Sequence, residues 1–433
     1  MRRVAITGLG ILNSLGAGLG EVWPRLVGGG NGIRPISFFD ASRYRSKVAA
    51  EVDLFDGAGR LEGETYAAPI DVGGIHESGI RRGARVFLEC AREAFHSSGL
   101  AESGFNRDTA GVAAGFSAAF LGVELVLDYY RHRREDGLEV DLQAFPWAEL
   151  QPRDHFTCRL GDTTASLPAK LFGFRGPSLV CDTACAASGH AIGDAFRMIR
   201  TGRANVMLAG GATAIVSPIA ILYFAMLGAL SRNENPELAS RPFDRNRDGF
   251  VMGEGGGVVV MEEYEHARAR GAKILAEVAG FGANTCAINL TDPSADGGLE
   301  AQAMRLALQS ARLAPEEVGF VAAHGTSTEK NDRTEARAIR QTFGSLTRNL
   351  LVSSNKGQLG HTISGAAVTN LICAVQAIRD GVVPPTMHLD SLDPEVDLDC
   401  VPNEARRAPI SAALVNSFAF GGHNAVIAVR AAS

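Results

Sequence analysis

The sequence has no excess of positive charge and no long apolar run. Its 433 residues have a formal net charge of −6 at pH 7, which argues against nucleic acid as a bulk partner, because phosphate binding needs a basic surface. The longest apolar run extends only from Ile219 to Leu230, whereas a membrane-spanning helix needs about 20 residues. We therefore expect no nucleic acid partner, no membrane span, and a buried helix over 219–230.

The cysteines form neither CxxC pairs nor metal-ligand spacings. Their number is odd, and they are scattered at positions 90, 158, 181, 185, 286, 373 and 400. Such a pattern is typical of reduced thiols rather than of a disulfide framework or a zinc site. The sequence predicts a cytoplasmic protein without a metal site.

The second half of the chain repeats the plan of the first. A helix and a strand at 84–98 and 111–114 correspond to a helix and a strand at 299–313 and 318–323. A strand, a helix and a strand follow in both halves. The first half has a strand at 178–181, a helix that ends at Gly202 and a strand at 205–209, and the second half has the segments 350–354, 365–379 and 412–416. We predict an α/β fold in which equivalent strand ends meet at a shared centre, with halves 1–262 and 263–433 and capping insertions in the first half.

Cys185 stands between a short apolar run and a helix that Gly202 should end. Small residues fill the junction, so the turn can be tight and another group can approach the cysteine closely. Unpaired N–H groups at a helix start favour the thiolate and can hold a developing oxyanion. Alone, a cysteine among alanines is more often an inert core residue, so its assignment as a nucleophile depends on the other motifs.

The segment 244–249 resembles the opening of a calcium-binding loop. Its aspartates and asparagine fit that pattern, but the twelfth position is Gly255, where a bidentate glutamate is required. We predict a charged surface turn that precedes a strand at 257–262.

Three further glycine-containing turns follow apolar runs, and each has a polar group. They are AHGTST at 323–328, SNKGQLGH at 354–361 and NSFAFGGHN at 416–424. A lone histidine beside a glycine is usually structural. His324 and His361, with Lys356 five residues before the second and a candidate thiolate elsewhere, indicate a shared site instead.

These motifs together resemble the elongating 3-oxoacyl-ACP synthases, the ketosynthase II type of the thiolase superfamily. TACAAS, HGTST with NDxxE, NKxxxGH and NSFxFGGHN occur in order, together with SRPFDxxRDGFVMGEG at 240–255. The similarity extends from Arg3 to Arg430. It implies a thiolase-like fold in which the two halves form a layered α-β-α-β-α sandwich.

The resemblance implies a decarboxylative Claisen condensation on Cys185. An acyl group passes from acyl carrier protein (ACP) to the thiolate, malonyl-ACP loses carbon dioxide, and the carbanion attacks the acyl-enzyme to give 3-oxoacyl-ACP. His324 and His361 would polarise the malonyl thioester and stabilise the enolate. Lys356 would hold the charge balance, with Glu335 as its buried partner. No organic cofactor or metal is implied.

The same similarity gives roles to further positions. The amides of Cys185 and Phe420 correspond to the oxyanion hole, and Phe420 also matches a gating phenylalanine. Asp332 belongs to the supporting NDxxE motif. Thr326 and Thr328 match the hydroxyls that receive the pantetheine arm.

Carrier proteins are acidic, so docking needs a basic patch. Arg81, Arg82 and Arg232 fall where the family keeps such residues. Ala118 and Phe120 depart from the glycine-rich turn of the housekeeping enzymes and should reshape the acyl pocket.

Two features leave the pathway open between fatty-acid and polyketide or polyene synthesis. Asn289 stands where a histidine is common, so gating of the loop 284–297 is expected to differ. The segment 34–52 looks closer to ketosynthase subunits of type II polyketide systems, which often form a heterodimer with a chain-length factor. The family is dimeric, and the sequence leaves both a homodimer and such a heterodimer open.

Two other functions use the same fold. A silent chain-length factor lacks the nucleophile, which is present here as Cys185. A degradative thiolase uses a second cysteine in a C-terminal glycine-rich turn, where this chain has His423, and a chain-initiating ketosynthase has Cys-His-Asn in place of Cys-His-His. We therefore predict an active elongating synthase.

Overall fold

The structure is a computed structural model that describes residues 1–52, 82–117 and 162–432. Its main sheet has the strand order β11-β10-β14-β15-β9-β1-β8-β7-β5-β6, and β2 pairs with β1. The predicted site residues Arg81, Ala118 and Phe120 lie outside the described part of the chain.

The two halves of the main sheet have the same strand plan. The first contains β1 (Val4–Asn13), β5 (Ala110–Gly115), β6 (Ser178–Cys181), β7 (Val206–Thr213) and β8 (Gly255–Glu263). The second contains β9 (Ala276–Thr285), β10 (Val318–Ala322), β11 (Leu351–Ser353), β14 (Ala412–Ala419) and β15 (His423–Arg430). The order 6-5-7-8-1 thus matches 11-10-14-15-9, which confirms the predicted repeat.

The halves join where β1 pairs antiparallel with β9, through Ala5 with Glu277 and Ile6 with Ala276. The remaining strands are short. They are β2 (Gly16–Ala17), β3 (Arg34–Pro35), β4 (Val48–Ala49), β12 (Val382–Val383) and β13 (Arg406–Arg407). The division of the chain at residue 262 stays a prediction.

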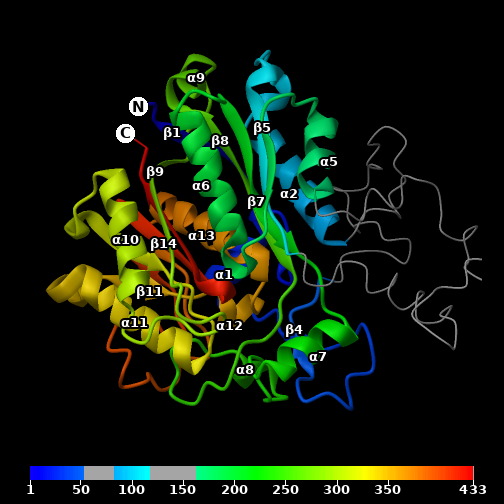
Figure 1. Ribbon diagram of the computed structural model, residues 1–433, viewed down its shortest axis with the longest axis vertical. Coiled ribbons are helices and arrows are strands. Elements are labelled where there is room, and N and C mark those ends of the chain that lie inside the picture. The colour runs from blue at the N-terminus through cyan, green and yellow to red at the C-terminus, as the bar shows by residue number, and fades with distance from the viewer. Residues whose placement is uncertain (53–81, 118–161, 433) are drawn as a thin grey trace, which may run out of the picture.

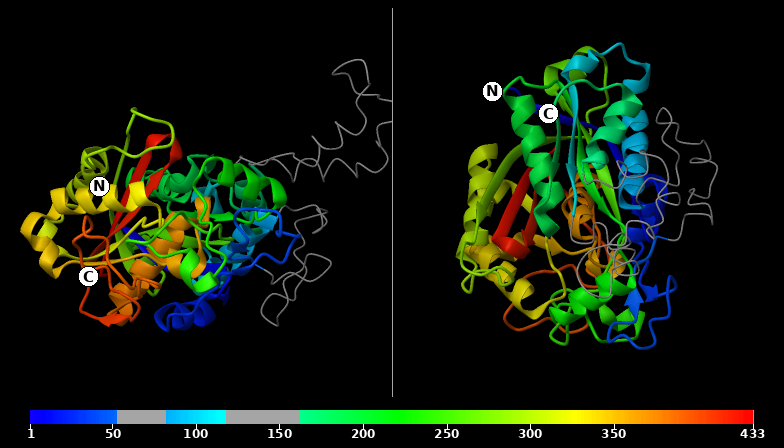
Figure 2. Two further views of the ribbon diagram at one scale, coloured as in Figure 1. Left: turned by 90° about the horizontal axis from the view of Figure 1, so that it is seen from below. Right: turned by 45° about the vertical axis from the view of Figure 1, so that its right-hand side comes forward.

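Helices form three layers around the two half-sheets. Outer helices α2 (Arg82–Ser97) and α5 (Thr163–Phe172) contact the first half, and α10 (Gly298–Ala311) and α11 (Glu329–Phe343) lie on the second half, on opposite sides of the molecule (Figures 1 and 2). The central helices α6 (Ala187–Arg200) and α13 (Ala366–Asp380) contact strands of both halves and each other. These five layers confirm the predicted sandwich.

The central helices approach closely because Gly189 of α6 has no side chain. A Cβ at this position would lie 3.1 Å from the Cβ of Ala425 and 3.4 Å from that of Ala367. Both helices begin near the centre of the molecule, α6 just after Cys185 and α13 just after a short turn that follows His361. The central layer therefore brings these two side chains toward one point.

The apolar run at 219–230 forms α7 (Pro218–Met226), but only one side of this helix is buried. Ile221 and Phe224 pack in a cluster with Phe250, whereas Leu222 is 50% exposed and Met226 is 80% exposed. The prediction of a helix is confirmed and that of a buried one is wrong. Because α7 is apolar on all sides, its periodicity does not show which side contacts the body. No helix in the described ranges is long and apolar enough to cross a bilayer.

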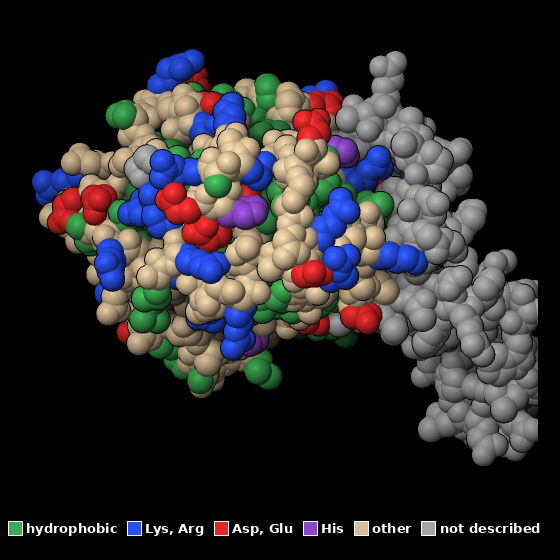
Figure 3. All heavy atoms as spheres, turned by 90° about the horizontal axis from the view of Figure 1, so that it is seen from above, with side chains coloured by type: hydrophobic (Ala, Val, Ile, Leu, Met, Phe, Trp, Pro, Cys, Tyr) green, Lys and Arg blue, Asp and Glu red, His purple; other side chains and the backbone are tan. Residues whose placement is uncertain are grey.

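The shorter helices connect the layers. They are α1 (Leu19–Val27), α8 (Pro236–Ala239), α9 (Tyr264–Ala269) and α12 (Lys356–Leu359). On the face that Figure 3 shows, basic and acidic side chains are interspersed.

The turn at 244–249 is predicted to lie on the surface, but two of its charged side chains, Asp244 and Arg247, are buried and paired. Asp244 is 1% exposed and accepts hydrogen bonds from the N–H groups of Ser391 and Asp390, at 2.7 and 3.1 Å. The guanidinium of Arg247 pairs with Asp393 at 2.9 Å. The surface prediction is wrong for Asp244 and Arg247, whose charges are satisfied within the protein, and is confirmed for Arg245, Asn246 and Asp248, which are exposed. The strand after the turn is confirmed as β8.

Gly115 provides a test of how the fold positions Cys185. A Cβ at Gly115 would lie 2.3 Å from the backbone nitrogen of Ser188, in the first turn of α6. We expect Gly115→Ala to displace that turn, to lower the free energy of unfolding by about 1–3 kcal/mol, and to lower the melting temperature. The control Gly104→Ala adds a methyl group with no atom within 4 Å and should melt close to the wild type. Equal melting of the two variants would contradict this account of the packing.

Candidate active site

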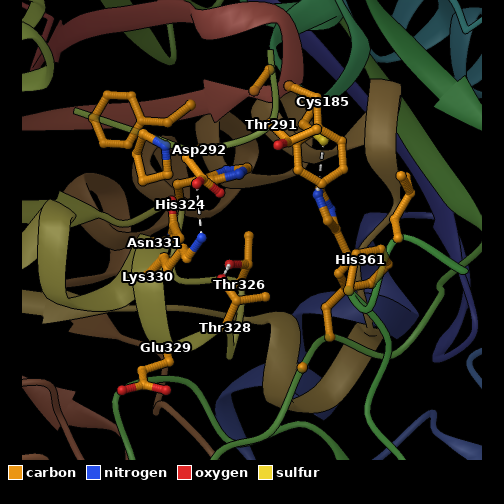
Figure 4. Close-up of a pocket in the computed structure, with 18 of the residues that line it drawn as sticks. Cys185, Thr291, Asp292, His324, Thr326, Thr328, Glu329, Lys330, Asn331 and His361 are labelled. Atoms are coloured by element: carbon orange, nitrogen blue, oxygen red, sulfur yellow. Dashed lines mark hydrogen bonds and ion pairs between the residues drawn. The ribbon is translucent and has the colours of Figure 1, made fainter. Parts of the chain in front are cut away.

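Three of the four predicted catalytic residues meet around a cavity of about 430 Å³, whereas the fourth, Lys356, is buried and is not among the residues that line it. Cys185, His324 and His361 line it, and the Cys185 sulfur and a ring nitrogen of each histidine all lie within 4.8 Å of one another. Figure 4 shows the cavity with its labelled side chains. The cysteine comes from the first half of the chain and both histidines from the second, so the site forms only where the halves meet.

Cys185 lies in a tight turn, Ala184–Ala186, between β6 and α6. It is 6% exposed, and its backbone carbonyl accepts a hydrogen bond from Ser417 Oγ at 2.8 Å. Ala184 has a φ of 47°, a left-handed conformation that costs energy for a residue with a side chain. The turn therefore holds the cysteine in a strained position above the start of the helix.

The ionisation of Cys185 is set by opposing effects. Burial raises the pKa of its thiol to about 12, whereas the charge of Lys356 and the N–H groups of Cys185 and Phe420 act to lower it. The sequence predicts that the helix start favours the thiolate, but the effect of burial on the pKa is larger. Both amides predicted for the oxyanion hole are near enough to the sulfur to stabilise its negative charge.

His361 contacts the sulfur directly, with Nε2 at 3.0 Å from Cys185 Sγ. The backbone N–H of Ile363 donates to Nδ1 at 3.3 Å. Because Nδ1 accepts this bond, the proton of the neutral ring lies on Nε2 and points at the sulfur. Burial, followed by the charge of Lys356, holds the pKa of His361 well below its usual value. The ring therefore stays neutral and acts as a hydrogen-bond donor.

His324 lies opposite His361, with the ring centroids 5.3 Å apart at 80°. It is 2% exposed, and within the described residues its Nδ1 has no hydrogen-bond partner. Burial, and then the charges of Lys356 and His361, lower the pKa of this ring well below its usual value. A buried polar nitrogen without a partner is costly, so its position on the cavity wall is suited to an atom of a ligand.

The peptide at His324 is held from both sides by buried charges. Glu335 accepts hydrogen bonds from the N–H groups of His324 and Gly325, at 2.8 and 2.7 Å, and from Asn416 Nδ2 at 2.9 Å. Lys356 Nζ donates to the carbonyl oxygen of His324. The turn that presents the histidine is therefore fixed by two ionisable side chains.

The sequence predicts Glu335 as the buried partner of Lys356. The structure shows no direct contact between these two side chains among the described residues. Among the described contacts the two side chains act on the same peptide, and their attraction is through space. Burial lowers the pKa of Lys356 to about 8, and the charge of Glu335 opposes that shift. The sequence motif indicates the pair correctly, but it cannot show that a backbone group lies between the charges.

Asp332 is a buried carboxylate that holds residues next to the cavity. It is fully buried, accepts a hydrogen bond from the N–H of Phe243 at 2.8 Å, and lies 3.4 Å from the guanidinium of Arg247. Burial raises its pKa, and Arg247 acts against that rise. This carboxylate joins α11 to the buried turn at 244–249.

Phe420 begins a glycine-containing turn on the cavity wall, Phe420–Gly422. Gly421 and Gly422 have φ values of 81° and 73°, which favour glycine. The turn is bonded to the loop that follows β9, because Gly421 N–H donates to Leu290 and Cys286 N–H donates to Gly422, at 2.7 and 2.8 Å. Movement of Phe420 is therefore coupled to this loop.

Thr326 and Thr328 line the cavity beside the histidines, and their hydroxyl oxygens are 2.8 Å apart. Two of the residues predicted for docking are described. Arg82 pairs at 2.8 Å with Glu254, whose side chain is fully buried, so this arginine has a structural task. Arg232 is exposed, and its backbone N–H donates to Asp248 beside the cavity.

Several residues that line the cavity are not predicted from the sequence. Cys286 lines the cavity, where Asn424 Nδ2 donates to its sulfur at 3.3 Å and Glu300 lies 3.5 Å from it. Asp292 and Lys330 form an ion pair on the cavity wall. The loop that contains Cys286 and Asp292 and the motif that contains Lys330 both stand out in the sequence. Their spacing along the chain does not indicate that these side chains meet at one cavity.

Comparisons with known proteins agree over the full length. The chain matches the N-terminal domain of beta-ketoacyl synthases over residues 1–267 and their C-terminal domain over 275–390. It is 38% identical over 430 residues to 3-oxoacyl-[acyl-carrier-protein] synthase 2 of Synechocystis sp., covering 99% of this chain and 98% of that protein. It is 36% identical over 433 residues to actinorhodin polyketide putative beta-ketoacyl synthase 1 of Streptomyces coelicolor, covering 99% and 88%.

Solved structures show the same similarity. One is a type II PKS acyl-carrier protein in complex with its ketosynthase bound to the hexaketide, with a TM-score of 0.86, 30% identity and full coverage of both chains. Another is the ishigamide ketosynthase/chain length factor, with a TM-score of 0.85, 30% identity and full coverage.

The reactivity of Cys185 tests the electrostatic balance. Since the charge of Lys356 lowers the Cys185 pKa, Lys356→Met should raise that pKa further and slow alkylation by iodoacetamide at pH 8, about ten-fold for each pKa unit. The modified residue is identified by mass spectrometry, with Cys185→Ala as the blank. Lys273→Met removes a charge from an exposed position outside the cavity and should alkylate like the wild type. Equal rates in the two lysine variants would refute this balance.

The buried histidines make stability depend on pH. Their pKa values lie well below the usual 6.5 in the folded chain, so below about pH 6.5 the unfolded chain binds more protons and is favoured. The free energy of unfolding should therefore decrease as the pH is lowered, by up to about 1.4 kcal/mol per pH unit for each histidine. Urea unfolding between pH 7.5 and 5 measures this slope, which should be shallower in His324→Asn/His361→Asn. An unchanged slope in that variant would contradict the neutral state of both rings.

Proposed function

Because the chain belongs to the β-ketoacyl synthase family, we propose that its cavity condenses an acyl group held on Cys185 with malonyl-ACP and releases 3-oxoacyl-ACP. The protein is an acyl-transferring condensing enzyme. The observation that supports the assignment of residues is the 3.0 Å contact between Cys185 Sγ and His361 Nε2, with the unpartnered ring of His324 beside it.

The first step is transfer of the acyl group. The Cys185 thiolate attacks the carbonyl carbon of the acyl-ACP thioester, and the carbonyl electrons move to oxygen. The amide N–H groups of Cys185 and Phe420, which both lie within reach of the sulfur, are the donors for this oxyanion. Collapse of the intermediate breaks the bond to the pantetheine sulfur, which leaves as a thiolate and is protonated.

The second step is decarboxylation of the malonyl thioester. Its carbonyl oxygen accepts hydrogen bonds from His324 and His361, whose low pKa values keep both rings neutral donors. The bond to the carboxylate breaks, its electron pair forms the enolate, and carbon dioxide leaves. The enolate carbon then attacks the acyl carbon on Cys185, and the cysteine leaves again as a thiolate. Two donors on one oxygen stabilise the enolate as its charge develops.

Lys356 positions this machinery without touching the reacting atoms. Its ammonium group lowers the pKa values of Cys185, His324 and His361 together. Its charge acts against the burial that raises the Cys185 pKa and adds to the burial that keeps both rings neutral, so it acts toward the thiolate beside two neutral rings that both steps require. We propose that no metal ion or organic cofactor takes part, because the loss of carbon dioxide supplies the driving force.

The substrates arrive on acyl carrier protein in this proposal. Thr326 and Thr328 line the cavity where a pantetheine arm would pass, and Arg232 offers a positive charge beside it. The relatives include proteins named for fatty-acid and for polyketide synthesis at 36–38% identity. We propose elongation of carrier-bound chains in one of these pathways, in the cytoplasm, where the free cysteines of the described chain stay reduced.

A partner chain is also part of the proposal. Strand β6 is the last strand at its end of the main sheet, and its residues are exposed or half-buried. An unpaired strand edge is a template for pairing with another chain. We propose that a second copy or a chain-length factor covers this edge.

The experiment is product analysis by mass spectrometry, with the purified chain, a series of acyl-ACP primers and malonyl-ACP. We expect a two-carbon extension that Cys185→Ala abolishes. Extension of saturated primers by the chain alone indicates a fatty-acid enzyme, whereas extension only after a partner protein is added indicates the polyketide type. Absence of acylation at Cys185 under all conditions would refute the proposed function.

His324 separates the two steps, because it faces the incoming malonyl group and its ring makes no hydrogen bond to the Cys185 sulfur in the described structure. His324→Ala should still be acylated at Cys185 but should lose condensation by at least about 100-fold. Intact-protein mass spectrometry measures the acyl-enzyme, and product analysis measures condensation. Loss of acylation together with condensation would contradict this division of roles.

A further inference from the structure

An ion pair joins two walls of the cavity. Lys330 Nζ lies 2.8 Å from Asp292 Oδ2, and their side chains are 69% and 40% exposed. Asp292 belongs to the loop between β9 and α10, and Lys330 to the first turn of α11. In Figure 4 this pair and the contact between Cys185 and His361 lie on different sides of the cavity.

Burial gives the cavity a direction. Cys185 and His361 are 6% and 2% exposed and Thr326 is 5% exposed, whereas the side chains of the ion pair are largely open to solvent. The chain from Thr326 to Lys330 therefore runs along the wall from the closed end toward the mouth. An arm that reaches Cys185 past Thr326 and Thr328 has its outer end beside Lys330.

Of the cationic side chains that line the described cavity, that of Lys330 is exposed to an incoming anion. Among the described lining residues, Arg247 and Lys330 have cationic side chains. The guanidinium of Arg247 is buried and already bonded to Asp393, Asp332 and three backbone carbonyls. Lys330 has one carboxylate partner, in an exposed ion pair of the kind that contributes little net stability. Exchange of that partner therefore costs little.

We propose that Lys330 binds the phosphate of the phosphopantetheine arm and gives up Asp292 to do so. This inference rests on the proposed function, because a carrier-bound thioester brings its phosphate to the mouth. An ammonium group and a phosphate oxygen form a charge-assisted hydrogen bond. The phosphate lies at the outer end of the arm and the thioester at its inner end, which matches the direction from Lys330 to Cys185.

The exchange has a consequence for the loop that holds Asp292. This loop is bonded to the Phe420 turn through Cys286 and Leu290. Release of Asp292 removes one of the contacts that hold the loop, beside those of Ser294 with Glu300 and Thr334, and the bonds to Gly421 and Gly422 connect this change to Phe420. Arrival of the arm is thereby coupled to the side chain that borders the nucleophile.

The test compares two arms that differ only in the phosphate, hexanoyl-pantetheine and hexanoyl-4′-phosphopantetheine. The second-order rate constant for acylation of Cys185 is measured by intact-protein mass spectrometry. The wild type should prefer the phosphorylated arm by about five-fold at low salt, and the preference should shrink as salt is added. Lys330→Ala should remove the preference, and Lys330→Arg should retain it.

Two further variants control the result. Asp292→Asn removes the competing carboxylate and should increase the preference for the phosphorylated arm. Lys273→Ala, an exposed lysine outside the cavity, should behave like the wild type and excludes a general effect of net charge. A preference unchanged in Lys330→Ala, or unchanged in Asp292→Asn, would overturn the exchange. Failure of both arms and of hexanoyl-ACP to acylate wild-type Cys185 would instead refute the proposed function itself.

Discussion

The site depends on a single buried positive charge. Lys356 is 1% exposed, and burying an ammonium group is costly unless other groups compensate it. The compensation comes from the carbonyl of His324 and, through space, from Glu335 and Asp332. The buried charge has a function, because it stabilises a thiolate and, together with burial, keeps both nearby imidazoles neutral. A more polar cavity would hold Lys356 more cheaply but would weaken its effect on those groups.

The repeated fold explains how groups so far apart in the chain reach this charge. Each half provides a turn that leads into a central helix, Cys185 before α6 and His361 before α13. The helices contact both half-sheets, so the two turns meet at the centre. Few sheet hydrogen bonds are shared between the halves, since β1 and β9 pair over only a short stretch. The helical layer, more than the continuous sheet, sets the geometry of the site.

The sequence predicts the features that local patterns specify. The repeat, the order of the helices and strands, and the turns that present Cys185, His324 and His361 all follow from apolar periodicity and glycine placement. It does not predict contacts that depend on which surfaces meet. The exposed side of α7, the burial of the turn at 244–249, and the peptide between Lys356 and Glu335 all arise from packing of distant segments. For the same reason, the sequence does not predict the contact between Lys330 and Asp292.

The division of the site between halves has a consequence during synthesis of the chain. Cys185 belongs to the part made first, whereas the residues that cover it, from Phe420 and the loop after β9, come later. Until these segments fold, the thiol lacks the cover that Ile363 and Phe420 add to the cluster of first-half residues around it, and a more accessible cysteine reacts more readily with oxidants. Burial in the finished structure is therefore also chemical protection, and a chain that stalls halfway loses that protection together with its activity.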